Sequence, residues 1–139
     1  DLTAAPLDGL NLLFTYSRNS SKITKAAESV NNRRPTEAGP KHLLNVWANY
    51  TIPNGLVKGL GFGAGVNYAS ENIITDSAPT GQFILPAYTL FNASISYTYK
   101  NYELAVKGNN LSDKTYYNGW TTVNPRMPRS ILGSVAYRF

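Results

Sequence analysis

The sequence predicts an all-β protein, an antiparallel up-and-down meander of about six strands. Two observations lead to this fold class. Apolar and polar residues alternate with a period of two in six segments of about 8 to 12 residues, and the connections between them are short turns and long polar loops in turn. β-Branched, aromatic, Gly and Asn residues crowd these segments, which leaves residues 25–30 as the best candidate for a short helix.

The six segments are residues 10–17, 43–52, 60–69, 88–99, 102–110 and 129–139. Asp8-Gly9, just before the first segment, favours a tight turn. Pro53-Asn54-Gly55 joins the second segment to the third, and Lys100-Asn101 joins the fourth to the fifth, both with residues typical of hairpin turns. Three long polar loops remain: residues 18–42, 70–87 and 111–128.

One face of these segments is apolar throughout. Of its 28 positions 26 are apolar and none is charged, whereas the opposite face has eight apolar residues among 28. A charge facing lipid at mid-depth costs about 2–4 kcal/mol, so an uncharged face is expected where strands contact lipid. Aromatic residues near the strand ends also suit a membrane interface: Tyr16, Tyr50, Tyr68, Tyr97, Tyr99, Tyr102, Tyr137 and Phe139.

Short turns at one end and long loops at the other are typical of an outer-membrane β-barrel. The smallest bacterial barrels have about eight strands, and an open edge in hydrocarbon leaves backbone groups unpaired. We therefore expect the six strands to form part of a larger barrel or to associate through their edges. Two alternatives remain open: a soluble or oligomerising β-protein that binds an apolar ligand or a protein partner, and a porin fragment.

The composition excludes several kinds of site. The chain has no Cys and a single histidine, His42, so neither a thiolate nucleophile nor a multi-histidine metal site is available, and we expect no metal site and no bound cofactor. The inward carboxylate Glu103 lacks a second carboxylate or a His partner, so we expect no catalytic residues and no enzyme; an ion pair with Arg138 is expected instead. The net charge is 13 − 8 = +5, but the basic residues form no stripe along a single element, so we expect no nucleic-acid partner.

Several stretches are similar to one family. They are residues 40–50, 59–68 and 85–90, the motif Asn110-Leu111-Ser112-Asp113-Lys114-Thr115-Tyr116, and the closing strand from Pro128 to Tyr137-Arg138-Phe139. In this order they resemble the C-terminal part of a TonB-dependent outer-membrane receptor of the ferric-siderophore type. The asparagine-containing motif followed by the terminal strand is the most specific part of this resemblance.

The resemblance implies a 22-stranded transmembrane barrel, of which residues 1–139 are a single partial domain without the plug that fills the lumen. It implies uptake of a ferric siderophore as the transported ligand, in the bacterial outer membrane. TonB would act through an N-terminal part that this segment lacks. On this topology the loops 18–42, 70–87 and 111–128 face the outside of the cell.

The loop 111–128 carries the candidate ligand-binding residues Tyr116, Tyr117, Trp120 and Arg126. Aromatic rings stack on a catecholate or cover an apolar chelate, and a guanidinium pairs with its negative charge. Trp47, on the polar face, is expected to contact the plug, and Gly61, Gly63 and Gly65 to allow close approach of the plug or a bend. The basic loop residues also suit the phosphates of lipopolysaccharide.

The last segment predicts a second recognition element. Val135, Tyr137 and Phe139 share one face at a period of two. In outer-membrane proteins such a strand resembles the signal that the barrel assembly machinery recognises, by addition of a strand to an exposed edge. The same exposed edges predict self-association of the isolated segment.

Overall fold

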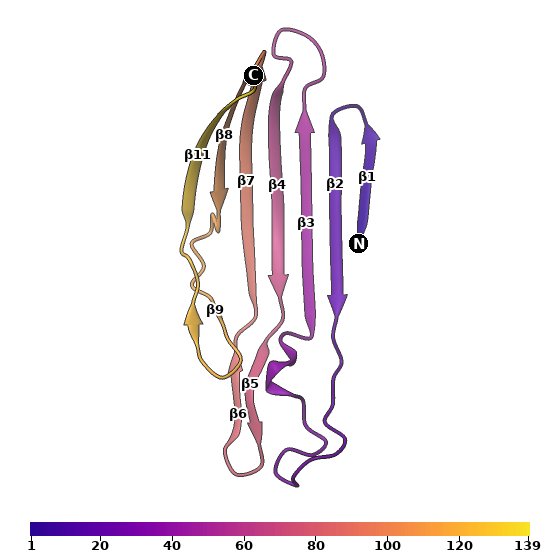
Figure 1. Cartoon of the computed structure of the whole chain (residues 1–139), viewed down its shortest axis with the longest axis vertical. Coiled ribbons are helices and arrows are strands. Elements are labelled where there is room, and N and C mark those ends of the chain that lie inside the picture. The colour runs from indigo at the N-terminus through magenta and orange to yellow at the C-terminus, as the bar shows by residue number, and fades with distance from the viewer.

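The computed structural model describes all 139 residues and consists of one curved antiparallel sheet with loops at one end (Figure 1). Seven strands lie side by side in the order β1-β2-β3-β4-β7-β8-β11. Their bounds are β1 (Leu2–Leu7), β2 (Leu10–Arg18), β3 (His42–Thr51), β4 (Leu60–Ala69), β7 (Tyr88–Tyr99), β8 (Tyr102–Asn109) and β11 (Ser130–Tyr137). The predicted all-β meander is confirmed, because each of the six predicted segments is one of these strands.

The strand that sequence analysis missed is β1. Pro6 interrupts its alternation, and the register with β2 shifts between Ala4 and Leu7. Proline lacks a backbone donor and is tolerated in an edge strand or at a bulge, which is where it stands here. The expected turn at Asp8-Gly9 does form: Gly9 has φ +82°, and a Cβ there would overlap the Thr51 carbonyl oxygen.

The strand register assembles the apolar residues into one continuous face. Residues of adjacent strands stand opposite one another, so that each row crosses the sheet on the same side. One such row is Phe14, Val46, Val66 and Phe91, and another is Leu12, Ala48, Ala64, Ala93, Gly108 and Ile131. Phe91 is 50% exposed, and only nine of the 139 residues are buried. No second layer of this chain covers the apolar face.

On the opposite, polar face, Trp47 lies flat against β4. A Cβ at Gly63 or Gly65 would overlap its ring, so the indole itself fills the space above these glycines. The Lys107 ammonium lies 5.7 Å from the centre of the Trp47 ring, which is a favourable cation–π arrangement. The close approach that the glycines allow is therefore made by a side chain of the neighbouring strand.

The long loops contain structure that the sequence did not reveal. A hairpin, β5 (Asn72–Ser77) and β6 (Gly81–Leu85), extends beyond the sheet (Figure 1). A short ladder joins β9 (Tyr117–Asn118) to β10 (Asn124–Pro125). A 3₁₀ turn, η1 (Thr36–Ala38), precedes β3. The structure holds no helix of the length and hydropathy needed to cross a membrane.

Residues 25–30, the best candidate for a short helix in the sequence, do not form one. The segment is a turn, in which the Val30 and Asn31 amides both donate to the Ala27 carbonyl. Reciprocal backbone hydrogen bonds of Ile23 with Arg33 and Asn32 bring the two ends of the turn together. The chain therefore doubles back at this point.

Candidate functional site

The loop that follows β8 is held by the side chain of Asn110, which is only 3% exposed. Its Nδ2 donates to the carbonyls of Lys114, at 2.9 Å, and Met127, at 3.5 Å, while its Oδ1 accepts from the Lys114 amide at 2.9 Å. Asn110 has φ +50°, a conformation that asparagine adopts more readily than most residues. The asparagine of the family-like motif therefore ties the two ends of the loop together.

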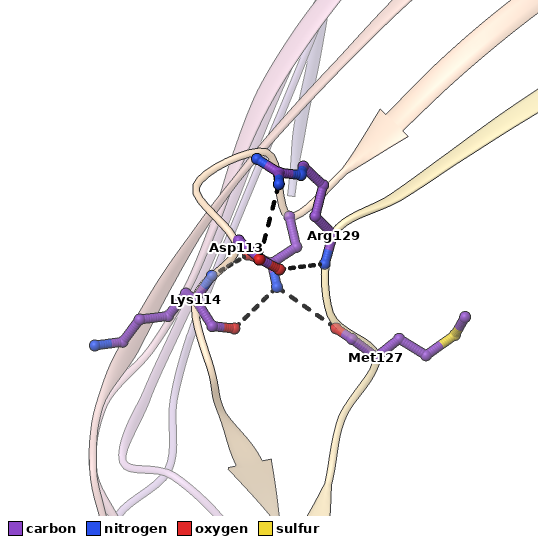
Figure 2. A network of polar contacts seen from close by, with 5 residues as sticks. Asp113, Lys114, Met127 and Arg129 are labelled. Carbon is purple, nitrogen blue, oxygen red and sulfur yellow. Dashed lines mark hydrogen bonds and ion pairs between the residues drawn. The ribbon is translucent and has the colours of Figure 1, made fainter.

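Asp113 adds further contacts at the same junction. Its Oδ1 accepts from the Arg129 amide at 2.8 Å, and its Oδ2 lies 3.9 Å from the Arg129 guanidinium (Figure 2). The Lys114 side chain points away from this network (Figure 2). Residues 115–126 are thus presented as a closed loop between two fixed ends.

A chain of amide side chains runs from this junction across the polar face. The Asn110 amide donates to Asn92 Oδ1 at 3.0 Å, Asn92 Nδ2 donates to Asn67 Oδ1 at 2.5 Å, and Asn67 Nδ2 donates to Asn45 Oδ1 at 2.6 Å. The side chains of Asn92 and Asn67 each accept one of these hydrogen bonds and donate the next, so the bonds polarise one another. This ladder links β3, β4 and β7 directly to the loop after β8.

The other two long loops are tied to each other. Arg33 Nη1 lies 2.6 Å from Asp76 Oδ1, in a pair whose carboxylate is 5% exposed, and the Ala78 amide donates to the Ser29 carbonyl. Asn72, in β5, donates to the Gly119 carbonyl at 2.8 Å and so joins the hairpin to the loop 111–128. The three loops contact one another at the end of the polar face.

Two hollows open among these loops. The outer hollow, of about 440 Å³, lies between η1, the β5–β6 hairpin and the loop 117–124; its wall includes Glu37, Asn72, Tyr88, Tyr117 and Trp120. The inner hollow, of about 380 Å³, lies on the polar face of the sheet; its wall includes Trp47, Asn92, Lys107, Tyr116 and Arg126.

The structure divides the four predicted ligand-binding residues between the two hollows. Tyr117 and Trp120 line the outer hollow, and Tyr116 and Arg126 line the inner one. Tyr116 packs against Tyr88, which lines the outer hollow, with ring centres 4.6 Å apart, so the walls of the two hollows meet at this tyrosine pair. Sequence analysis missed Glu37 and Asn72, which come from other loops and carry no local signal in the sequence.

The two hollows differ in charge. Glu37 is the one residue of the outer wall with a charge at neutral pH, whereas Lys107 and Arg126 are the charged residues of the inner wall. Lys107 stands out in the sequence as an inward-facing charge on a strand. The inner hollow therefore suits an anionic group, and amide side chains surround it with further hydrogen-bonding groups.

The opposite end of the last strand carries the predicted assembly signal. β11 is an edge strand, and Val135 is 74% exposed. Tyr137 packs between Tyr102, at 5.0 Å, and Phe139, at 5.4 Å between ring centres. The predicted ion pair forms, with Arg138 Nη2 3.0 Å from Glu103 Oε2. Nowhere do three or more His, Cys, Asp or Glu side chains meet in an arrangement suited to a metal ion.

Comparison with known proteins gives a consistent picture. The family model described as TonB dependent receptor-like, beta-barrel matches residues 2–111. The chain is 29% identical over 120 residues to the ferric-pyoverdine M114 receptor PbuA of Pseudomonas sp. (strain M114), covering 85% of this chain and 14% of that protein. It is 27% identical over 118 residues to the ferrichrome outer membrane transporter/phage receptor of Escherichia coli (strain K12), covering 81% and 15%.

Solved structures share the fold. The ferric-catecholate import receptor Fiu from K12 E. coli superposes with a TM-score of 0.79 at 17% identity, over 99% of this chain and 20% of that one. The siderophore receptor PiuA from Acinetobacter baumannii gives a TM-score of 0.73 at 22% identity, over 97% and 20%. The chain spans about a seventh of the length of the curated relatives it matches. With a family model that covers most of its length, the chain belongs to the TonB-dependent receptor family, within the β-barrel domain.

Proposed function

We propose that this chain is a C-terminal segment of the barrel of an outer-membrane receptor that imports ferric siderophores. It supplies seven strands of a barrel of 22, and the plug lies in another part of the receptor. The family is one of receptors, so the ligand crosses the membrane without any bond being made or broken. Both curated relatives described above are named for a ferric siderophore, which supports the class of ligand.

The apolar face is the observation on which the membrane location rests. Its large side chains are exposed, including Phe62, Ile95 and Leu104 at 45 to 47%, and no part of the chain covers them. A soluble sheet of this size would bury such a face against a second layer. Lipid covers the face in the complete barrel, and the neighbouring strands of the barrel satisfy the open edges of β1 and β11.

The inner hollow is the part of this segment best suited to hold the chelate. Lys107 and Arg126 present two positive charges, and Tyr116 and Trp47 present aromatic surface beside them. Charges of one sign in a concave site raise the local concentration of oppositely charged ligands. A ferric complex with net negative charge is therefore attracted to this wall as it enters the lumen.

Four further interactions belong to the same proposal. TonB acts through the N-terminal part of the receptor, which this segment does not include. The barrel assembly machinery binds the exposed edge of β11 with Val135, Tyr137 and Phe139. The basic residues of the outer loops bind lipopolysaccharide phosphates. The isolated segment self-associates through its strand edges.

Uptake of iron tests this function. Cells that express the complete receptor containing this chain are given radioactive ferric complexes of anionic catecholates and of neutral hydroxamates. We expect saturable uptake that is lost on deletion of TonB. For an anionic chelate, the Lys107→Gln, Arg126→Gln double variant is expected to raise the half-saturating concentration about three- to tenfold, since each exposed charge contributes up to about 1 kcal/mol.

The Lys22→Gln, Lys114→Gln pair provides the matched control, because it also removes two positive charges, from side chains that line neither hollow. It should leave uptake unchanged. Absence of uptake for every ferric chelate, or uptake that persists without TonB, would overturn the proposed function. If uptake is TonB-dependent and the double variant behaves like the control, the inner hollow is not where the chelate binds.

A further inference from the structure

We propose that the outer hollow is a subsite for a cationic nitrogen group, a primary ammonium or a guanidinium, carried by the ligand of the receptor. This inference rests on the proposed function, and it adds a charge preference for the part of the ligand that contacts the outer hollow. The wall of the outer hollow includes no Lys or Arg, although the formal net charge of the protein is +5.

Aromatic side chains form much of this wall. Tyr88, Tyr117 and Trp120 come from β7, β9 and the loop between β9 and β10. The face of an aromatic ring attracts a cation through its quadrupole, and several rings around one hollow are a recurrent way to bind organic ammonium groups. Trp120 is 58% exposed, so its surface is open to a ligand.

A carboxylate completes the hollow. Glu37 contributes a carboxylate from η1 and is the single charged residue of the wall at neutral pH. Asn72 uses its Nδ2 to bond the Gly119 carbonyl, and its Oδ1 has no hydrogen-bond donor although the residue is only 7% exposed. That oxygen exposes less than 1 Å² of surface, so Glu37, and not Asn72, is the acceptor available to a ligand in the hollow.

The neighbouring inner hollow has the opposite preference. Its charged residues are Lys107 and Arg126, and its Tyr116 packs against Tyr88 of the outer hollow, with ring centres 4.6 Å apart. A ligand that bridges the tyrosine pair would place an anionic part against the inner wall and a cationic part against the outer wall. The fold therefore selects a ligand with both charges, and it sets their order along the path.

Fluorine NMR of the complete receptor tests the subsite directly. The receptor that contains this chain is prepared in detergent with 5-fluorotryptophan, and a Trp120→Phe variant identifies the Trp120 resonance. Three probes are titrated: phenethylammonium, its neutral isostere 2-phenylethanol, and the anion 3-phenylpropionate. We expect a saturable shift of the Trp120 resonance with phenethylammonium, at least about threefold tighter than with 2-phenylethanol, and none with the anion.

A matched pair of variants separates the carboxylate of the hollow from the general charge of the loops. Glu37→Gln is expected to weaken phenethylammonium binding at least about threefold. Glu71→Gln removes the same charge from a nearby residue that does not line the hollow, and it should have no effect. Glu37 is exposed, so its replacement leaves the fold intact.

Several outcomes would overturn the inference. The Trp120 resonance could stay in place with phenethylammonium, or respond equally to the neutral isostere. Glu37→Gln could also bind like the parent receptor. The titration involves no iron, so its result is separate from that of the uptake assay: uptake with a negative titration overturns the subsite alone, and a positive titration without any uptake overturns the proposed transport alone.

Discussion

The sheet and the loop layer of this molecule are stabilised in different ways. All three buried polar residues, Asn72, Asp76 and Asn110, lie in the loops or at their junction with β8, and each bonds a segment distant in sequence. In the sheet, the apolar face stays exposed, and the residues buried there are Gly61, Gly63, Ala69 and Leu90. The loops supply their own partners, whereas the sheet needs a partner that this chain lacks. We therefore expect the sheet to be sensitive to what faces the bilayer and the loops to be sensitive to individual polar contacts.

The largest expected effect is that of a charge on the apolar face. Ala93 lies near the middle of β7 in the apolar row, and alanine has little apolar area to lose. Ala93→Lys would therefore mainly add a charge in hydrocarbon, at a cost of about 2–4 kcal/mol. The free energy of unfolding of the complete receptor, measured by denaturant titration in lipid vesicles, reports this cost.

Ser96→Lys is the matched control, since it introduces the same residue on the polar face of the same strand, opposite the uncharged Gly61 and Ala105. We expect a change below about 1 kcal/mol there, as for surface substitutions in general. If the two variants were equally destabilised, lipid would not be what covers the apolar face, and the comparison between sheet and loops would lose its basis.

The sheet was predictable from the sequence because alternate residues of a strand share a face, so a period of two identifies the side chains that lie together. The six predicted segments and their apolar face follow from this rule, and the Glu103–Arg138 pair follows from antiparallel pairing of the last two strands. β1 was not predicted because Pro6 interrupts its alternation of apolar and polar residues. The turn over residues 25–30 was not predicted because it depends on contacts between Ile23 and Arg33 rather than on helix propensity.

The loop layer was less predictable because its contacts join residues far apart in the chain. Arg33 and Asp76 are separated by 43 positions, and Asn72 and Gly119 by 47. The loop residues Tyr116, Tyr117, Trp120 and Arg126 lie close together in the sequence, but the fold divides them between two hollows. What each hollow contains depends on residues such as Glu37 and Lys107, which other segments supply.

Removal of the Asn110 side chain is expected to have the largest effect within the loop layer. Asn110→Ala leaves the Lys114 amide and carbonyl without their partner and places alanine at a positive φ. The local cost is about 2 kcal/mol, typical of buried polar groups that lose their hydrogen bonds. Amide hydrogen exchange of residues 114–129 in the complete receptor should accelerate by about thirtyfold, the equivalent of that free energy.

Two further variants distinguish the reasons for this effect. Asn109→Ala, one residue earlier, removes a single long hydrogen bond of 3.4 Å to Ser130, so exchange should change little. Asn110→Gly restores the freedom to adopt a positive φ and still lacks the side chain. Exchange in Asn110→Gly as slow as in the parent would mean that backbone conformation, and not the amide hydrogen bonds, holds the loop.

The smallest expected effect is that of breaking an ion pair, and each region contains one pair to compare. In the loops, Arg33→Met leaves Asp76, whose carboxylate is 5% exposed, without its partner. We expect a local loss of about 1–2 kcal/mol, below the range for fully buried pairs because Arg33 is one-third exposed. In the sheet, Arg138→Met breaks an exposed pair with Glu103, in which the arginine side chain is 80% exposed, and the expected loss is below about 0.5 kcal/mol.

Hydrogen exchange at a backbone amide beside each pair reads out this difference. The Ala78 amide, bonded to the Ser29 carbonyl, reports on the loop pair, and the Arg138 amide, bonded to the Asn101 carbonyl, reports on the sheet pair. Exchange at Ala78 in Arg33→Met should accelerate about 5- to 30-fold, whereas exchange at residue 138 in Arg138→Met should change by less than about threefold. Equal acceleration would show that burial of Asp76 adds nothing to its pair. Loop and sheet would then respond alike to a broken ion pair, although they differ in how their apolar residues are covered.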